Sequence, residues 1–341
     1  MMHRYLSICV LAFGLHASAQ NIFIPDTNLR VWMNNAKPNS VDIGGNCDTA
    51  LWNVQPPQGV YCPVYNLPNN STVDLQGIQH LKMDYLQISG ATNDSIHVLW
   101  PGYPLLVEQI ALERVNTGLF SPAMFPMPPS VQSFYCDRCG ITQLPGFSGA
   151  WMVVKNTDLS GQVLNVPPSV ISLDLVNCAL STSPAVPNVT NLTIDDNPLT
   201  SWANLPANLG NLTANNVGLS TPPPVAGSTT LTYLEIGNNG HTAIPALPPT
   251  LEYLHMDDNL LVTIPSLAGT TLRSLHVSNN PLTALPQLPA TLEYLYAENT
   301  AITTLPNPLP PILKQLNVSG DQITTIPPLP SSFQWLWINN S

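Results

Sequence analysis

Two pairs of side chains in this 341-residue chain have the types and spacing of a metal or redox site. Cys136 and Cys139 form a C-x-x-C motif, a spacing that serves zinc binding or exchange between dithiol and disulfide. His255 and His276 form the second pair, and their imidazoles would share a metal ion if the fold stacked them in adjacent turns. No third ligand of suitable type accompanies the histidines, so the pattern does not favour zinc.

Two acidic pairs, Asp195-Asp196 and Asp257-Asp258, offer the oxygen ligands that calcium requires. The chain contains no D-x-[DN]-x-[DN]-G loop, however, and paired acids on an exposed face are commonly only solvated. Motifs of the G-x-S-x-G, H-E-x-x-H, P-loop and G-x-G-x-x-G types are also absent. The sequence therefore predicts a protein that is not an enzyme and that holds no metal ion or other cofactor.

An internal repeat supplies the elements that must position these residues. One copy reads Leu251-x-x-Leu254-x-Met256-x-x-Asn259-x-Leu261, and copies recur about every 21 residues, within the 20–29 residues of leucine-rich repeats. The pattern covers residues 75–341 and predicts about 13 turns. Further clear copies open at Val131, Val170, Val189, Leu209, Leu231, Leu272, Leu292, Leu313 and Phe333. Weaker copies open at Met83, Val107 and Gly149.

Each repeat is expected to contribute one short β-strand, because the L-x-L segment alternates inward and outward with a period of two. Equivalent strands stack in parallel about 4.7–4.9 Å apart, so the repeats should build a solenoid roughly 60 Å long. The return segments, such as residues 244–250, contain too much proline for a helix and should run extended, close to polyproline II. The predicted fold is an α/β-class leucine-rich repeat horseshoe with parallel strands on its concave face and extended segments on its convex side.

One position of the repeat is expected to form a polar ladder inside the solenoid. A short side chain there can satisfy backbone groups of neighbouring turns that would otherwise be buried without a partner. Cys139 falls on this position and Cys136 on the last inward-facing site of its strand, so we favour core and ladder roles over zinc or redox chemistry. The predicted ladder residues are Asn197, Asn239, Asn259, Asn280, Cys139 and Cys178.

The outward-facing strand residues should stack in columns on the concave face. Aromatic residues are concentrated in these columns, as is typical of a binding surface, although tyrosine also suits exposed strand sites. The candidate ligand-binding residues are Tyr233, Glu235, Tyr253, His255, Asp257, His276, Tyr294, Tyr296, Glu298, Trp335 and Trp337.

Charge excludes one large class of partner. Twenty acidic residues against nine basic ones give a net charge of −11, and only 9% of the residues are charged. In residues 156–341 the only bases are Arg273 and Lys314. Because phosphate groups are bound by clusters of lysine and arginine, neither nucleic acid nor an anionic membrane surface is an expected partner. The hydrophobic fraction of 44% is sufficient for a folded core despite the 36 prolines.

Residues 1–19 have the three parts of a secretory signal peptide. Arg4 supplies a basic start, residues 6–15 are apolar, and Ala17-Ser18-Ala19 is a small-residue cleavage site. No later apolar run reaches the roughly 18 residues that a membrane-spanning helix needs. The sequence therefore predicts a secreted or cell-surface protein without a membrane span.

Residues 20–74 lack the repeat pattern and are predicted to form an N-terminal cap, which a solenoid needs at the end of its core. Asp26 or Thr27 would begin a short helix with one apolar face. Cys47 and Cys62 lie close together in this segment, and an oxidising compartment would allow them to form a disulfide. The I-P-D-x-N-L start of the segment resembles that of leucine-rich proteins from Bacteroidetes-type bacteria.

The L-P-x-L-P-x-x-L form of the return segments resembles the short leucine-rich repeats of bacterial secreted effectors and surface proteins. Some of those effectors carry a C-terminal ubiquitin-ligase domain with a catalytic cysteine. The resemblance and the concave columns predict a non-enzymatic binding module that recognises a protein, or alternatively a glycan. Because Ser341 falls within a repeat, a second hypothesis is a recognition arm whose sorting, anchoring or ubiquitin-ligase-like domain lies beyond it.

Overall fold

The computed structural model of the chain describes residues 21–23, 46–48, 61–67, 72–74, 82–90, 97–99, 106–115, 127, 129–267 and 269–339. The predicted signal peptide and the helix expected near Asp26 lie outside these residues. The side chains of Cys47 and Cys62 also lie outside the description, so their disulfide stays a prediction.

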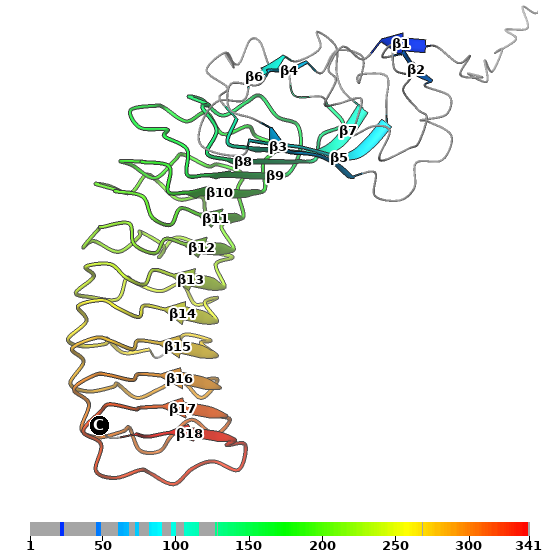
Figure 1. Cartoon of the computed structure of the whole chain (residues 1–341). Helices are drawn as coiled ribbons and strands as arrows, with labels where there is room; N and C mark the ends of the chain where they lie inside the picture. The colour runs from blue at the N-terminus through cyan, green and yellow to red at the C-terminus, as the bar shows by residue number, and fades with distance from the viewer. Residues whose placement is uncertain are drawn as a thin grey trace, which may run out of the picture.

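One parallel sheet of 14 strands runs along the solenoid. The strands follow the order of the chain, and each of the predicted repeat copies contributes one of them (Figure 1). The stack of turns bends, with the strands on its inner side, so they form the concave face. The strands are β3 (Tyr61–Leu67), β5 (Lys82–Gly90), β7 (Leu106–Glu113), β8 (Ser133–Asp137), β9 (Trp151–Lys155), β10 (Ser172–Val176), β11 (Asn191–Thr193), β12 (Asn211–Thr213), β13 (Tyr233–Glu235), β14 (Tyr253–His255), β15 (Ser274–His276), β16 (Tyr294–Tyr296), β17 (Gln315–Asn317) and β18 (Trp335–Trp337).

The N-terminal part adds two small sheets and one strand that the repeat pattern did not predict. β1 (Asn21–Phe23) pairs antiparallel with β2 (Asn46–Asp48), and β4 (Thr72–Asp74) pairs parallel with β6 (His97–Leu99). β3 belongs to the main sheet, although its residues fall within the segment 20–74 expected as a cap. It carries a proline and pairs with β5 through an irregular register, which explains why it does not show the regular repeat.

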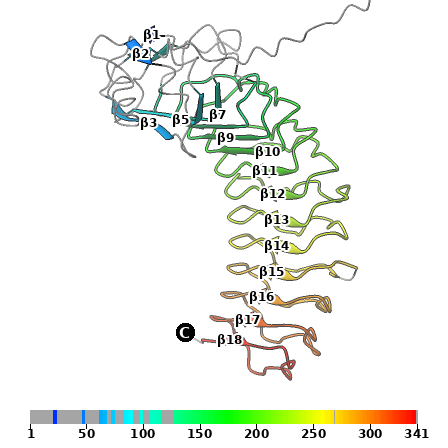
Figure 2. The ribbon, with the colours of Figure 1, turned by 90° about the vertical axis from the view of Figure 1, so that its right-hand side faces the viewer.

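Register is regular along the rest of the sheet. From β13 to β16 the central residues Leu234, Leu254, Leu275 and Leu295 lie opposite one another. Because a strand alternates its side chains between two faces, this register places every equivalent residue in a column. Figure 2 shows the turns stacked regularly from β9 to β18. The predicted solenoid with one strand per repeat is thereby confirmed.

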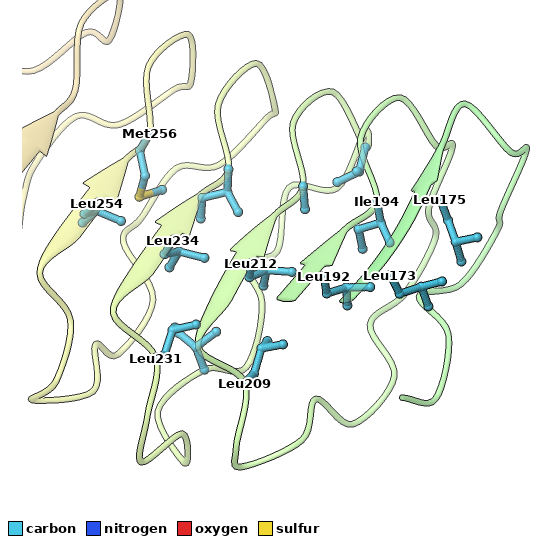
Figure 3. Packing of buried hydrophobic residues seen from close by; sticks show 14 of the residues in the cluster. Leu173, Leu175, Leu192, Ile194, Leu209, Leu212, Leu231, Leu234, Leu254 and Met256 are labelled. Atoms are coloured by element: carbon cyan, nitrogen blue, oxygen red, sulfur yellow. The ribbon is translucent and has the colours of Figure 1, made fainter. Parts of the chain in front are cut away.

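The inward-facing leucines form one continuous core. Leu234, Leu254 and Met256 are fully buried, and Figure 3 shows them stacked with their equivalents in the preceding turns. Burying one such side chain contributes about 1.5–3 kcal/mol. In a solenoid each turn packs mainly on its two neighbours, so the stability of one turn depends on the turns beside it.

Proline keeps the return segments thin. No helix occurs among the described residues, and the segments between the strands are joined by an isolated bridge between Thr182 and Ser201 and by single backbone hydrogen bonds, such as that from the N–H of Ala301 to the carbonyl oxygen of Leu282 at 2.8 Å. A proline within a helix would remove a hydrogen-bond donor and clash with the preceding turn. Within the described residues the return segments are therefore not helical, as the sequence predicted.

Asn259 shows how the ladder position satisfies the backbone inside the solenoid. Its Nδ2 donates to the carbonyl oxygens of Ile236, Met256 and Asp257 at 3.0, 3.1 and 3.1 Å. Its Oδ1 accepts a hydrogen bond of 3.1 Å from the backbone N–H of His241 in the previous turn. The same pattern of contacts recurs at Asn197, Asn239 and Asn280.

We expect Asn259→Ala to lower the free energy of unfolding by about 1–3 kcal/mol, because it leaves buried backbone groups without partners. Asn211→Ala is the control, since Asn211 is exposed on the sheet and should change stability by less than about 0.5 kcal/mol. Urea denaturation of both variants and the parent measures the difference. Equal midpoints for Asn259→Ala and the parent would contradict the ladder.

His241 occupies a core site that other turns fill with leucine or isoleucine. The equivalent residues Leu261 and Leu282 are fully buried, and so is His241. Neither ring nitrogen of His241 makes a hydrogen bond of good geometry with the part of the chain that the structure describes. Burial lowers the pKa of His241, and a contact with the backbone of Ser220 opposes the shift only in part. This turn therefore contains a neutral imidazole that the core does not need.

Candidate binding site on the concave face

The sheet brings nine of the eleven sequence-predicted binding residues together in two columns, and the other two, Asp257 and Glu298, lie at the next outward-facing site beyond their strands. The first column follows the first outward-facing site of each strand, and the second column follows the next outward-facing site. From β13 to β18 the first column holds Tyr233, Tyr253, Ser274, Tyr294, Gln315 and Trp335. The second column holds Glu235, His255, His276, Tyr296, Asn317 and Trp337.

Rings stack on one another across these strands. His255 and His276 lie face to face with ring centroids 3.9 Å apart, and Tyr296 follows at 4.3 Å from His276. The ring of Tyr233 meets His255 edge-on at 5.3 Å, and Trp337 lies 6.4 Å from Tyr296. We call these five residues the aromatic strip. Such pairs of rings contribute about 0.5–1.5 kcal/mol each beyond their buried area, so the strip is a firm surface.

Both histidines of the strip are neutral at neutral pH. Burial and the neighbouring His255 lower the pKa of His276 to about 4, and burial also lowers the pKa of His255. The ring of His276 contacts the hydroxyl of Ser274 at 3.0 Å, and its Nδ1 lies 3.8 Å from a carboxylate oxygen of Asp257. Two stacked imidazoles cannot both take a proton without strong repulsion, because like charges would then be in contact.

Carboxylates line the strip. Glu235 accepts hydrogen bonds from the hydroxyl of Tyr233 at 2.5 Å and from Nδ2 of Asn215 at 2.9 Å. Asp257 accepts a bond of 2.6 Å from the backbone N–H of Ser278, and burial raises the pKa of Asp257 to about 6. Glu298 accepts a hydrogen bond from Nδ2 of Asn317. Asp195 accepts one of 2.7 Å from the backbone N–H of Asn215. The acids are held in place by the sheet itself.

The second acid of each aspartate pair has a different role. Asp196 and Asp258 have φ of 58° and 56°, the left-handed conformation that favours asparagine and aspartate. They belong to a corner that other turns fill with residues such as Asn216, whose Nδ2 donates to Asp196 at 2.9 Å. Within the described residues no group of three or more histidine, cysteine or acidic side chains is placed to hold a metal ion.

Cys139 and Cys178 occupy the ladder position. The Sγ of Cys178 lies 3.3 Å from the carbonyl oxygen of Val154, and burial raises the pKa of this thiol to about 11. The structure joins Cys139 to Cys136 in a disulfide, a bond that the sequence interpretation as core and ladder residues did not include. The bond forms because both sites face the interior and their Cα atoms lie 6.0 Å apart, within the usual disulfide range.

An ion-pair ladder that sequence reasoning missed runs along the edge of the concave face. Arg273 pairs with Glu252 at 3.3 Å and with Glu293 at 2.8 Å, and Lys314 pairs with Glu293 at 2.5 Å. The hydrogen bond from Lys314 lowers the pKa of Glu293, and Arg273 adds to the effect. Each of these residues directly precedes the first column in its turn. Acidic and basic residues therefore alternate from one repeat to the next at this position, and that pattern in the sequence could have predicted the ion pairs. Both bases of residues 156–341 are therefore already paired.

A pocket lies away from the strands, between return segments. Its volume is about 410 Å³, and it is lined mostly by apolar residues, among them Leu144, Phe147 and Val166. No ionisable side chain among the described residues lines it, so it could contact an apolar group but offers no acid, base or metal ligand.

Helices able to cross a membrane are absent from the described residues.

Comparisons with known proteins give the fold. No protein-family model and no curated sequence matches the chain. YopM from Yersinia enterocolitica WA-314 matches with a TM-score of 0.60 at 25% identity, over 83% of this chain and 65% of the YopM chain. The match thus spans less than two thirds of YopM. An internalin (inlF) from Listeria monocytogenes matches with a TM-score of 0.54 at 17% identity, over 94% of this chain and 98% of that chain.

The repeat pattern and the register of the sheet agree with these likenesses. Each repeat copy opens one turn, and each turn places one parallel strand on the concave face. The chain is a leucine-rich repeat protein.

Proposed function

We propose that the chain is a non-enzymatic binding protein, secreted or displayed on the cell surface, that recognises a protein through its concave face. The observation that carries the proposal is the alignment of exposed and half-buried aromatic side chains over strands β13 to β18. Tyr253, Trp335 and Trp337 remain 37%, 59% and 38% exposed. Tyrosine and tryptophan offer large contact area with little side-chain entropy to lose, which makes them typical anchors of protein interfaces.

The fold does not require aromatic residues at these sites. Ser274 and Gln315 occupy the same column as Tyr253 and Tyr294, and the register is unchanged in their turns. The neighbouring strands β11 and β12 hold Asn191 at the equivalent site and asparagine again in the next turn. The aromatic residues are therefore surplus to the needs of the sheet, which favours a role in recognition.

A glycan is the alternative ligand, and the ring geometry makes it the weaker one. A sugar ring binds an aromatic residue by lying flat on an open face. His255 and His276 cover each other at 3.9 Å, and Tyr296 lies over the other side of His276 at 4.3 Å. Ring edges rather than faces thus meet the solvent at the centre of the strip, which suits the side chains of a protein partner.

The proposed location, secreted or on the cell surface, depends on the predicted signal peptide. The alternative of a larger protein with a further domain depends only on the similarity to other leucine-rich repeat proteins. The internalin from Listeria monocytogenes and YopM from Yersinia enterocolitica are similar to this chain in fold. A recognition arm for a further sorting, anchoring or ubiquitin-ligase-like domain remains the alternative that the sequence offered.

Photo-crosslinking from single sites tests the proposal. We expect p-benzoylphenylalanine at position 253 to give an adduct with a protein from cell-surface extracts, because Tyr253 is exposed at the centre of the first column. The same group at position 287 is the control, since Gln287 is exposed on the convex side. An adduct that forms from position 287 and not from position 253 would contradict a concave binding site.

A further inference from the structure

Charge is distributed unevenly over the concave face. From β10 to β18 the outward-facing sites of the described strands and their continuations hold no lysine or arginine. The two bases of this region lie before the columns, where Arg273 and Lys314 are paired with Glu252 and Glu293. The carboxylates on the face are Asp174, Asp195, Glu235, Asp257 and Glu298.

No lysine or arginine among the described residues of the face neutralises these carboxylates. His255 and His276 are stacked and half-buried, so protonating both would place two positive charges in contact. Glu235 accepts hydrogen bonds from a phenol hydroxyl and an amide, Glu298 from an amide, and Asp257 from a backbone N–H, and all of these donors are neutral. His276, a titratable base, lies near Asp257. An anionic face of this kind attracts cationic partners and repels anionic ones.

The carboxylates lie within the same turns as rings that are exposed, as Tyr253 is, or half-buried, as Tyr294 is. In the turn of β14, Tyr253 and Asp257 lie on either side of His255, and in the turn of β16, Tyr294 and Glu298 lie on either side of Tyr296. The chain itself shows that such a ring accepts a cation, because the Nζ of Lys314 lies 5.9 Å from the ring centroid of Tyr294.

Carboxylates and aromatic rings that share one face match the chemistry of arginine. The guanidinium group is planar, forms two parallel hydrogen bonds with a carboxylate and stacks on an aromatic ring. Lysine is a compact point charge: it can lie over a ring, but it has no planar group to stack there and cannot form two parallel hydrogen bonds with a carboxylate. The arrangement therefore distinguishes between the two kinds of basic side chain.

We propose that the concave face binds an arginine-rich segment of a partner protein, whose guanidinium groups pair with Glu235, Asp257 and Glu298 and stack on Tyr253 and Tyr294, which lie outside the aromatic strip. This inference rests on the proposed function and names the chemistry of its partner. The charge complementarity also explains why the bases of the region are confined to the edge ladder, where each of them is paired with glutamate.

A labelled octa-arginine peptide is the probe, and fluorescence anisotropy with the full chain at about 0.15 M salt measures its affinity. The variant Glu235→Gln, Asp257→Asn, Glu298→Gln removes three charges and keeps an oxygen acceptor at each site, including the one for the N–H of Ser278. We expect it to weaken binding about tenfold or more, because charge-assisted hydrogen bonds are the strong ones. Octa-lysine should bind the parent several times more weakly than octa-arginine.

The matched control is Asp158→Asn, Asp196→Asn, Asp258→Asn, which changes the net charge by the same amount. Asp158 is exposed, and the corner sites of Asp196 and Asp258 are asparagine in other turns, so this variant should fold. We expect it to weaken binding less than about threefold, since its charges lie off the columns. Thermal melts of both variants establish that they are folded.

Equal losses in the two triple variants would mean that only net charge attracts the peptide, and would overturn the proposal. Equal affinity for octa-lysine and octa-arginine would also overturn it, because stacking and paired hydrogen bonds would then have no part. If octa-arginine fails to bind while a protein crosslinks from position 253, the concave face is a binding site whose partner is not arginine-rich. That outcome separates failure of this inference from failure of the proposed function.

Discussion

Replacing Tyr253 and Tyr294 together with alanine should weaken binding of the crosslinked partner about thirtyfold or more, since interface anchors typically cost about 2 kcal/mol or more on truncation. The two residues belong to the same column, in turns separated only by that of Ser274. Their side chains point away from the core, so the loss concerns contact with the partner and not packing of the solenoid. Titration of the purified partner by isothermal calorimetry measures the change.

Gln287→Ala is the control for this pair. Gln287 is exposed on the convex side, and its Nε2 donates to the carbonyl oxygen of Pro308 at 3.2 Å. The control should leave affinity unchanged, and both variants should keep the circular dichroism and melting temperature of the parent to within a few degrees. Loss of binding in Gln287→Ala with full binding in the tyrosine pair would place the site on the convex side.

The fold could be predicted because every repeat has the same spacing of buried apolar residues. The spacing of Leu251, Leu254 and Met256 specifies one buried strand, and its recurrence specifies the neighbour on which that strand stacks. Once the register is known, the columns of the concave face follow without any further information. The two residues of the histidine stack, His255 and His276, were placed side by side by this spacing alone.

Features that depend on two different positions of the repeat could not be predicted in the same way. The bond between Cys136 and Cys139 joins a strand site to a ladder site, and the repeat pattern treats these sites separately. The ion-pair ladder of Glu252, Arg273 and Glu293 lies outside the L-x-L pattern, where side chains are long and their direction is decided by neighbours. The strand β3 has no repeat signature at all, and only its pairing with β5 places it in the sheet.

We expect His241→Leu to raise the free energy of unfolding by about 1–3 kcal/mol at neutral pH, the cost of a buried polar group without good partners. Leucine is the residue that the turns with Leu261 and Leu282 use at the same site, so the core already has the shape to accept it. Urea denaturation of the variant and the parent at pH 7.5 measures the gain.

The gain of His241→Leu should grow as the solution is acidified. The unfolded chain binds a proton at His241 with an ordinary pKa of about 6.5, whereas burial lowers the pKa of His241 in the folded chain. Below about pH 6.5 the unfolded state therefore holds more protons, and the parent loses stability by up to about 1.4 kcal/mol per pH unit. The variant lacks this loss, so the difference between the two chains widens on the acid side.

The difference between parent and variant isolates His241 from the other titrating groups. His255, His276 and Asp257 have shifted pKa values too, and the two kinds of shift act in opposite directions on acid stability, but both chains carry them. Leu261→Met, at the equivalent site one turn on, is the control and should give a small change that is the same at every pH. A stability difference for His241→Leu that stays constant from pH 7.5 to 5 would show that the buried imidazole takes up its proton as readily in the folded chain as in the unfolded one.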